Sequence, residues 1–189
     1  MSDDTIRLGV IIGSTREGRF AATVGGWFAD VARQHPELVI DVIDLAELGL
    51  PAVHPADQTP ELRAYADRLA AADAFVVVTP EYNHGYPASL KFAIDSAHVQ
   101  WQTKPVGFVS YGGISGGLRA VEQLRQVFAE LHAVTVRETV SFHYVHGRFD
   151  EAGNPKDSDG PAAAAKTMLD QLVWWARAAA EARNRRPYR

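Results

Sequence analysis

The chain has 189 residues, a formal net charge of −4 and no cysteine. This length suits one domain with a sizeable core, and the charge gives no reason to expect nucleic acid as a partner. Without cysteine the chain has no disulfides, thiolate metal sites or cysteine nucleophiles, which fits a reducing compartment. The first residues lack the layout of a signal peptide, and no apolar run approaches the ~20 residues that span a bilayer. We therefore expect a single cytoplasmic domain over residues 1–189, without a membrane partner.

Hydrophobic periodicity predicts strands and helices in alternation. Short runs of apolar residues are typical of strands in a buried parallel sheet, and apolar residues at three- and four-residue steps indicate helices. The expected strands cover residues 6–12, 38–45, 74–78, 105–111 and 133–140. The expected helices cover residues 20–35, 60–69, 87–99, 118–132 and 161–183, whereas 46–58 and 141–160 are expected to be irregular. Because each connection is long enough for a crossover, the pattern predicts a three-layer α/β sandwich with a parallel sheet.

The loop Gly13–Arg19 joins the first strand to the first helix. Backbone N–H groups and the helix dipole attract phosphate at such a place, and Ser14, Thr15, Arg16 and Arg19 add hydroxyls and planar cations. The loop has the glycine spacing of a nucleotide P-loop but lacks the lysine and hydroxyl that bind a triphosphate. A single terminal phosphate is the expected guest. The alternative is a surface turn with two solvated arginines.

Two further loops follow strands that we expect at the centre of the sheet. The segment Pro80–Pro87 contains two tyrosines, an amide and a glycine, and the segment Ser110–Gly117 contains hydroxyls and paired glycines. Aromatic faces with backbone donors suit a flat heteroaromatic ring that has a polar edge. Ligands of such sheets bind beyond the carboxyl ends of the strands, where the strand order reverses. A phosphate clamp beside a ring slot describes a site for flavin mononucleotide (FMN).

The three loops also carry recognisable motifs. They are Gly13-Ser14-x-Arg16-x-x-Arg19, Pro80-Glu81-Tyr82-Asn83-x-Gly85-Tyr86-Pro87-Ala88-x-Leu90-Lys91, and Ser110-x-Gly112-Gly113 followed by Gly116-Gly117. Together they resemble the NADPH-dependent FMN reductase family, a flavodoxin-like group that includes FMN, quinone, azo-dye and chromate reductases. The resemblance covers residues 6–131, and the second motif is its most specific part. It implies a flavodoxin-like five-stranded parallel sheet of order 2-1-3-4-5 with helices on both faces.

The resemblance also implies which residues contact the cofactor. The expected phosphate ligands are Ser14, Arg16, Arg19 and the amides of Phe20 and Ala21, beside the hydroxyl of Thr15. The expected contacts of the flavin ring are Pro80, Glu81, Tyr82, Asn83, Ser110, Tyr111, Gly112 and Gly113. The expected rim of the substrate pocket is His84, Gly85 and Tyr86. Arg19 stands where many relatives carry a serine or another polar residue.

The activity implied by the resemblance is that of an FMN-dependent NAD(P)H oxidoreductase. NADPH or NADH would deliver hydride to flavin N5, and a quinone, free flavin, azo compound or chromate would then be reduced. Since the chain offers no second dinucleotide-binding region, both substrates should use one pocket in turn, which predicts ping-pong kinetics. The flavin carries this chemistry, so we expect no catalytic acid or base. The alternatives are a non-enzymatic flavodoxin-like electron carrier and a cofactor-free binding or signalling domain.

Four polar residues near these loops have competing interpretations. His143 and His146 suggest a metal pair, but without a convincing third ligand we interpret them as loop histidines and expect no metal. The carboxylate of Glu81 is expected to make local hydrogen bonds rather than to act as a base. Ser115 suits both a cofactor contact and a cap for the following helix.

Aromatic residues outside the loops suggest contacts between subunits. Trp174 and Trp175 point to different helix faces, so one is expected in the core and the other at a partner surface. With Tyr86 and Trp101 as expected exposed aromatics, and with the dimers and tetramers that the resemblance implies, they predict a homodimer or homotetramer.

Overall fold

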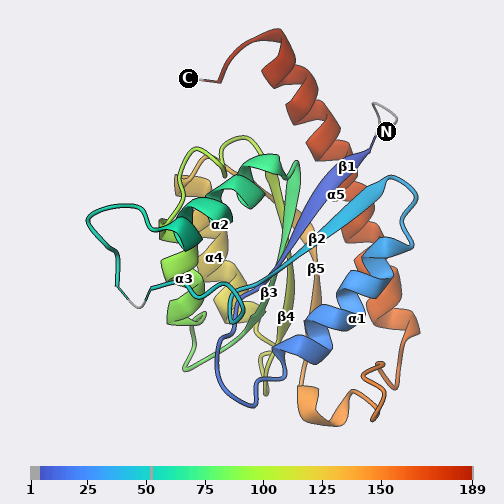
Figure 1. Ribbon diagram of the computed structural model, residues 1–189. Helices are drawn as coiled ribbons and strands as arrows, with labels where there is room; N and C mark the ends of the chain where they lie inside the picture. The colour runs from blue at the N-terminus through green and yellow to red at the C-terminus, as the bar shows by residue number, and fades with distance from the viewer. Residues whose placement is uncertain (1–4, 52, 189) are drawn as a thin grey trace.

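Five parallel strands form one sheet with helices on both faces in this computed structural model, which describes residues 5–51 and 53–188 (Figure 1). The strands are β1 (Ile6–Ile12), β2 (Leu38–Asp44), β3 (Ala74–Pro80), β4 (Pro105–Tyr111) and β5 (Val134–Phe142). The helices are α1 (Ala21–Arg33), α2 (Pro60–Ala71), α3 (Ala88–Asp95), α4 (Leu118–Glu130) and α5 (Asp159–Arg185), with a short 3₁₀ helix η1 (Val145–Gly147). The strand order is β2-β1-β3-β4-β5 with parallel pairing throughout, which confirms the predicted flavodoxin-like sheet.

Two apolar layers cover the sheet. The helices α1 and α5 pack on one face, and α2, α3 and α4 pack on the other (Figure 1). Gly25 allows α1 to lie close to the sheet, because a Cβ atom at this position would be 2.6 Å from Ile12 Cδ1. This contact accounts for a glycine inside a helix, where it costs about 1 kcal/mol relative to alanine. In the part of the chain that the structure describes, none of the helices is long and apolar enough to cross a membrane.

Two of the differences in length from the prediction affect the core and the carboxyl edge of the sheet. The helix α3 ends at Asp95 instead of near Val99, because the chain then turns and inserts Trp101 into the core. The indole of Trp101 is fully buried and donates a hydrogen bond to the Ile94 carbonyl oxygen at 3.1 Å. The strand β5 continues to Phe142 because its last residues pair with the end of β4. That extension carries the chain to the same edge of the sheet as the loops that follow β1, β3 and β4.

The predictions for the aromatic residues were wrong in three cases. Trp101 is buried, not exposed, and Tyr86 is half-buried against the layer that α2, α3 and α4 form. Trp174 and Trp175 are both exposed, at 63% and 41%, and pack edge to face on each other at 4.9 Å. Neither enters the core, because the buried stripe of α5 is formed by its smaller neighbours. These neighbours are Ala165, Met168, Leu169, Leu172, Val173 and Ala176.

Lys104 is a buried cation at the amino end of β4. Its ammonium donates hydrogen bonds to the carbonyl oxygens of Leu69 at 2.8 Å and Ala70 at 3.1 Å, in the last turn of α2. Burial and the nearby charge of Arg183 lower the pKa of Lys104 to about 8, against the opposing effect of Asp73. The side chain therefore joins a helix end to a strand but carries its charge at a cost.

We expect the stability of the wild type, relative to Lys104→Met, to increase as pH rises from about 8 to 10.5. Below this range the lysine is charged in both states, so the folded protein bears the whole cost of burying the charge. Within it, the folded protein has lost the proton that the unfolded chain still binds, and a higher pH favours folding. The change should be about 1–3 kcal/mol in the free energy of unfolding. Urea unfolding of both proteins across this range measures it, and a constant difference would contradict the prediction.

Candidate functional site

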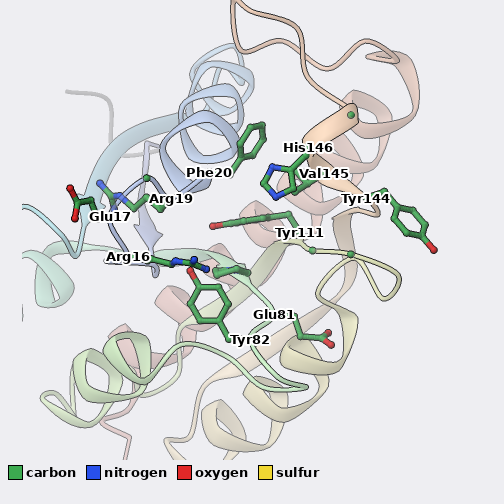
Figure 2. Close-up of a pocket in the computed structure, with 15 residues that line it drawn as sticks. Arg16, Glu17, Arg19, Phe20, Glu81, Tyr82, Tyr111, Tyr144, Val145 and His146 are labelled. Carbon is green, nitrogen blue, oxygen red and sulfur yellow. The ribbon is translucent and has the colours of Figure 1, made fainter.

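A pocket of about 750 Å³ lies at the carboxyl edge of the sheet (Figure 2). Its walls come from four segments, namely residues 16–20 after β1, 80–82 after β3, 111–113 after β4 and 144–147 after β5. The strand order reverses between β1 and β3, so this is the place where a doubly wound sheet binds its ligands. The volume is within the range of ~300–1,000 Å³ that is usual for small-molecule sites.

The first loop offers an unsatisfied anion site. The helix α1 begins without a side-chain cap and without an acidic residue in its first turn. The Arg16 side chain is exposed, makes no hydrogen bond or ion pair with any described residue, and points into the pocket (Figure 2). Ser14 in the same loop is fully buried, with its Oγ 2.8 Å from the Tyr82 hydroxyl. A free guanidinium beside an uncapped helix N-terminus is suited to bind phosphate.

Arg19 also lines the pocket, but its guanidinium is already bound by the protein. Nη1 and Nη2 donate to the two carboxylate oxygens of Asp44 at 2.5 and 2.7 Å, and Nη1 donates to the Ser14 carbonyl oxygen at 2.7 Å. The hydrogen bond to Asp44 raises the pKa of Arg19 despite the opposing effect of burial. The predicted contact of Arg19 with phosphate stays a prediction, and this pairing does not favour it.

The carboxylate of Glu81 is directed away from the pocket, as Figure 2 shows. It accepts a hydrogen bond from Ser115 Oγ at 2.6 Å and pairs with Arg119 at 2.5 Å, which confirms the expected local hydrogen bonds. Burial alone would raise the pKa of Glu81, but these two partners outweigh it and lower the pKa. Ser115 Oγ also accepts a hydrogen bond from the Gly117 N–H at 3.4 Å, at the entry to α4. The Glu81 cluster thus ties the loop after β3 to the loop after β4.

The rest of the loop after β3 forms a tight hairpin. Tyr82 and Gly85 exchange backbone hydrogen bonds at 2.8 and 3.1 Å, and the two residues between them have positive φ angles of 49° and 78°. These residues, Asn83 and His84, are exposed at the tip and do not line the pocket. Gly85 and Tyr86 are not lining residues either. The structure therefore places the predicted rim beside the pocket, and its role in substrate binding stays a prediction.

Tyr111 forms the floor of the pocket. Its side chain is 4% exposed and extends across the hollow, as Figure 2 shows. Its buried hydroxyl lies near the Ser14 side chain but makes no hydrogen bond of good geometry within the described part of the chain. Burial raises the pKa of this phenol, so the group stays protonated and available as a donor. A buried donor without a partner is costly and indicates an unfilled position for a ligand acceptor.

The remaining predicted residues support the walls from behind or lie outside. Ser110 is fully buried and donates to the Gly116 carbonyl oxygen at 2.8 Å, which closes the glycine loop. Ala21 is fully buried as the first residue of α1. Thr15 faces a separate pocket of about 380 Å³ on the other side of the first loop. The predicted residues that line the site are Arg16, Arg19, Phe20, Pro80, Glu81, Tyr82, Tyr111, Gly112 and Gly113.

Sequence reasoning missed the wall formed by residues 144–147. The N–H groups of Tyr144 and Val145 donate to the carbonyl oxygens of Gly113 and Gly112 at 2.9 and 3.1 Å, which attaches this segment to the glycine loop. The ring of His146 packs edge-on to Phe20 at 5.5 Å. The segment has no periodicity that would mark it, because its position depends on contacts with residues far away in the chain. The described residues contain no group of three His, Cys, Asp or Glu side chains that suits a metal.

The fold defines a flavodoxin-like protein, and its pocket lies at the carboxyl edge of the sheet, beside an arginine that is unpaired among the described residues and an uncapped helix N-terminus. The sequence profile of the NADPH-dependent FMN reductase family matches residues 6–147. An NAD(P)H-dependent FMN reductase of Schizosaccharomyces pombe is 37% identical over 132 residues, which cover 65% of this chain and 66% of that protein. A probable NADPH:quinone oxidoreductase of Oryza sativa is 33% identical over 166 residues, which cover 81% of this chain and 83% of that protein.

Solved structures agree on the fold. The flavoenzyme NAD(P)H:(acceptor) oxidoreductase from Paracoccus denitrificans has a TM-score of 0.75 at 21% identity, over 92% of this chain and 98% of that one. This chain belongs to the NADPH-dependent FMN reductase family. The family, the oxidoreductase class and the cofactors FMN and NAD(P)H agree with the prediction from the three loop motifs.

The glycine loop yields a test of the site's architecture. Gly117→Ala should lower the free energy of unfolding by about 2–4 kcal/mol. Its φ is +85°, and a Cβ atom would lie 2.8 Å from Ser110 Cβ and 2.9 Å from the Tyr111 amide nitrogen. Gly113→Ala is the matched control, because nothing lies within 4 Å of a Cβ atom there. Urea unfolding of both variants measures the difference, and equal stability would show that the loop relaxes freely.

Proposed function

We propose that the pocket binds FMN, with the phosphate at the first loop and the ring between residues 80–82 and 111–113. The observation that carries this proposal is the combination of a free Arg16 guanidinium, an uncapped α1 N-terminus and the unpartnered Tyr111 hydroxyl around one hollow. The guanidinium and the hydroxyl are donors to which the described residues offer no well-placed acceptor, and the helix N-terminus is the positive end of a dipole without an anion. A ligand with a phosphate and further acceptor oxygens complements all three.

Individual roles follow from what each side chain already binds. Arg16 is the cation that meets the phosphate, helped by the N–H groups at the start of α1. Tyr111 donates its hydroxyl to an acceptor of the bound cofactor, and Gly112 and Gly113 let the main chain approach it. Tyr82 is held by Ser14 and offers its ring to the slot. The segment 144–147 limits the pocket on the remaining side.

The reaction that we propose is the reduction of a small acceptor by NAD(P)H. FMN held in this pocket would supply the redox chemistry, the transfer of hydride from NAD(P)H to flavin N5 and on to an acceptor such as a quinone, free flavin, azo compound or chromate. The quinone is favoured by the rice relative, which is named a quinone oxidoreductase. The described chain has one pocket of this size at the reversal point, so NAD(P)H and acceptor would enter it in turn, by a ping-pong mechanism.

The proposal extends to the assembly. Residues 1–189 would act as one cytoplasmic flavodoxin-like domain, in a homodimer or homotetramer. The two exposed tryptophans of α5 support association, because Trp174 and Trp175 present adjoining aromatic surface to solvent.

Arg16→Ala should weaken FMN binding by about 1.5–3 kcal/mol, the value of a charge-assisted hydrogen bond. This equals about 10–150-fold in the dissociation constant. Riboflavin lacks the phosphate, so its affinity should change little. Quenching of flavin fluorescence measures both. Arg63→Ala is the control, an exposed arginine on α2 outside the pocket. Equal FMN affinity of Arg16→Ala and wild type would contradict the assigned phosphate contact.

The oxidoreductase reaction is tested by mixing the FMN-loaded protein with NADPH or NADH under argon. Bleaching of the flavin absorbance within seconds is expected, followed by its return when a quinone is added. Initial rates at several quinone concentrations should give parallel double-reciprocal lines. Intersecting lines would contradict the shared pocket. A yellow protein that is not bleached would support an electron carrier, and a protein that takes up no FMN would support a cofactor-free domain.

A further inference from the structure

Arg19 lies at the phosphate loop but is occupied by an aspartate from another strand. We propose that Arg19 and Asp44 form a positioning pair that fixes the first loop, and that Arg19 is not a ligand of the phosphate. The proposal rests on the proposed binding of FMN in this pocket. It assigns a role to Asp44, which the sequence analysis did not single out.

The protein already uses three of the five N–H donors of the guanidinium. One edge makes a bidentate pair with Asp44, and Nη1 also binds the carbonyl oxygen of Ser14 at 2.7 Å. The two side chains are only 16% and 10% exposed. A shielded bidentate pair has short, charge-assisted bonds, and turning Arg19 toward a phosphate would leave the Asp44 carboxylate without its partner.

Asp44 is itself firmly placed. It is the last residue of β2 and pairs in register with Ile12, the last residue of β1. Its Oδ1 also accepts a hydrogen bond from the Ala46 N–H at 3.1 Å. The Arg19–Asp44 pair thus links the loop that leaves β1 to the end of the neighbouring strand. Because Asp44 cannot move without the sheet, the position of Arg19 is fixed as well.

The pair also determines which groups of the loop are free. Arg19 donates a hydrogen bond to the Ser14 carbonyl oxygen, whose partial negative charge would otherwise repel an anion. In the described chain, the backbone N–H groups of Thr15, Glu17 and Gly18 donate to no other atom. With Arg19 neutralised by Asp44, Arg16 is the cation of the loop that has no partner among the described residues. The loop therefore presents donors and one free cation.

Single and double variants of the pair distinguish a positioning role of Arg19 from a direct contact with the phosphate. If the pair positions the loop, Arg19→Gln leaves a shielded carboxylate without a partner near the phosphate, and removal of the second charge by Asp44→Asn should repair the damage. If Arg19 binds the phosphate, the double variant still lacks that contact, so only the loss caused by the unpaired Asp44 charge is repaired and FMN affinity stays below that of the wild type. Asparagine keeps the oxygen that accepts the hydrogen bond from Ala46.

The same strand offers a matched control. Arg68 pairs with both carboxylate oxygens of Asp41 and donates to the Val42 carbonyl oxygen at 2.7 Å. This is a second bidentate pair of an arginine with an aspartate of β2 that also has a backbone acceptor. Its side chains are more exposed, at 33% and 39%, and neither lines the pocket. Arg68→Gln with and without Asp41→Asn therefore reports what the loss of such a pair does to the fold alone.

The experiment is a titration of the flavin-free proteins with FMN and with riboflavin, followed by fluorescence quenching. Arg19→Gln should weaken FMN binding about tenfold or more, and Arg19→Gln/Asp44→Asn should return to within about threefold of the wild type. Riboflavin affinity should vary less than FMN affinity, and the Arg68 and Asp41 variants should bind FMN like the wild type. A double variant that stays more than about threefold weaker than the wild type in FMN affinity would overturn the proposal.

A second comparison covers the case in which Arg19→Gln fails to fold. Asp44→Asn and the double variant both lack the carboxylate, and they differ only in the guanidinium. Positioning predicts FMN affinities within about threefold of each other, whereas a phosphate ligand predicts a loss of about tenfold on removal of Arg19. A wild type that binds neither flavin would refute the proposed FMN site itself. If the wild type binds FMN but neither comparison gives the affinities that positioning predicts, only the positioning pair is refuted.

Discussion

The site depends on the double pairing of β1. This strand lies between β2 and β3, and its last residue, Ile12, is in register with Asp44 on one side and Val78 on the other. Beyond it, Gly13 still donates to the Val78 carbonyl oxygen at 2.9 Å, and the chain then leaves the sheet where the strand order reverses. The parallel register brings the ends of β3 and β4 to the same edge. Four loops from distant parts of the chain therefore meet in one pocket.

The loops are fixed by contacts behind the pocket rather than inside it. The Arg19–Asp44 pair secures the first loop, and the Glu81 cluster joins the second loop to the third. The Gly116 carbonyl oxygen accepts hydrogen bonds from both Ser110 and Ser141 at 2.8 Å, which anchors the glycine loop to β4 and β5. These charged and polar groups satisfy one another, so the pocket keeps its shape without a ligand. Such preorganisation lowers the cost of ordering the site on binding.

Most of the fold was readable from the sequence because a parallel sheet leaves strong local signals. The inner strands β1, β3 and β4 are nearly continuous apolar runs, and β1 and β4 have the predicted bounds. The errors occurred where distant contacts override local pattern. Trp101 was expected at the surface because nothing nearby in the sequence shows that the chain turns back into the core. The length of β5 depends on its pairing with the end of β4, which no local period reveals.

The candidate site was predictable to the extent that its chemistry is local. Loops after buried strands, rich in glycine, hydroxyls and tyrosine, marked three of the four walls. The sequence could not show which polar groups the protein satisfies by itself. Arg16 and Arg19 look equivalent in the motif, yet one is free and the other is bound to an aspartate 25 residues away. The same holds for hydroxyls, since Ser110 has a partner and Tyr111 has none among the described residues.

This division separates the residues that build the site from those that bind in it. A polar group that the protein already satisfies contributes to the shape of the pocket, and a ligand gains little by competing for it. The exposed Arg16 guanidinium is hydrated and free to exchange water for a ligand acceptor, whereas the buried Tyr111 hydroxyl costs free energy until it gains an acceptor. On this basis the proposed phosphate contacts are Arg16 and the start of α1, and the proposed role of Arg19 is in the scaffold that keeps them in place.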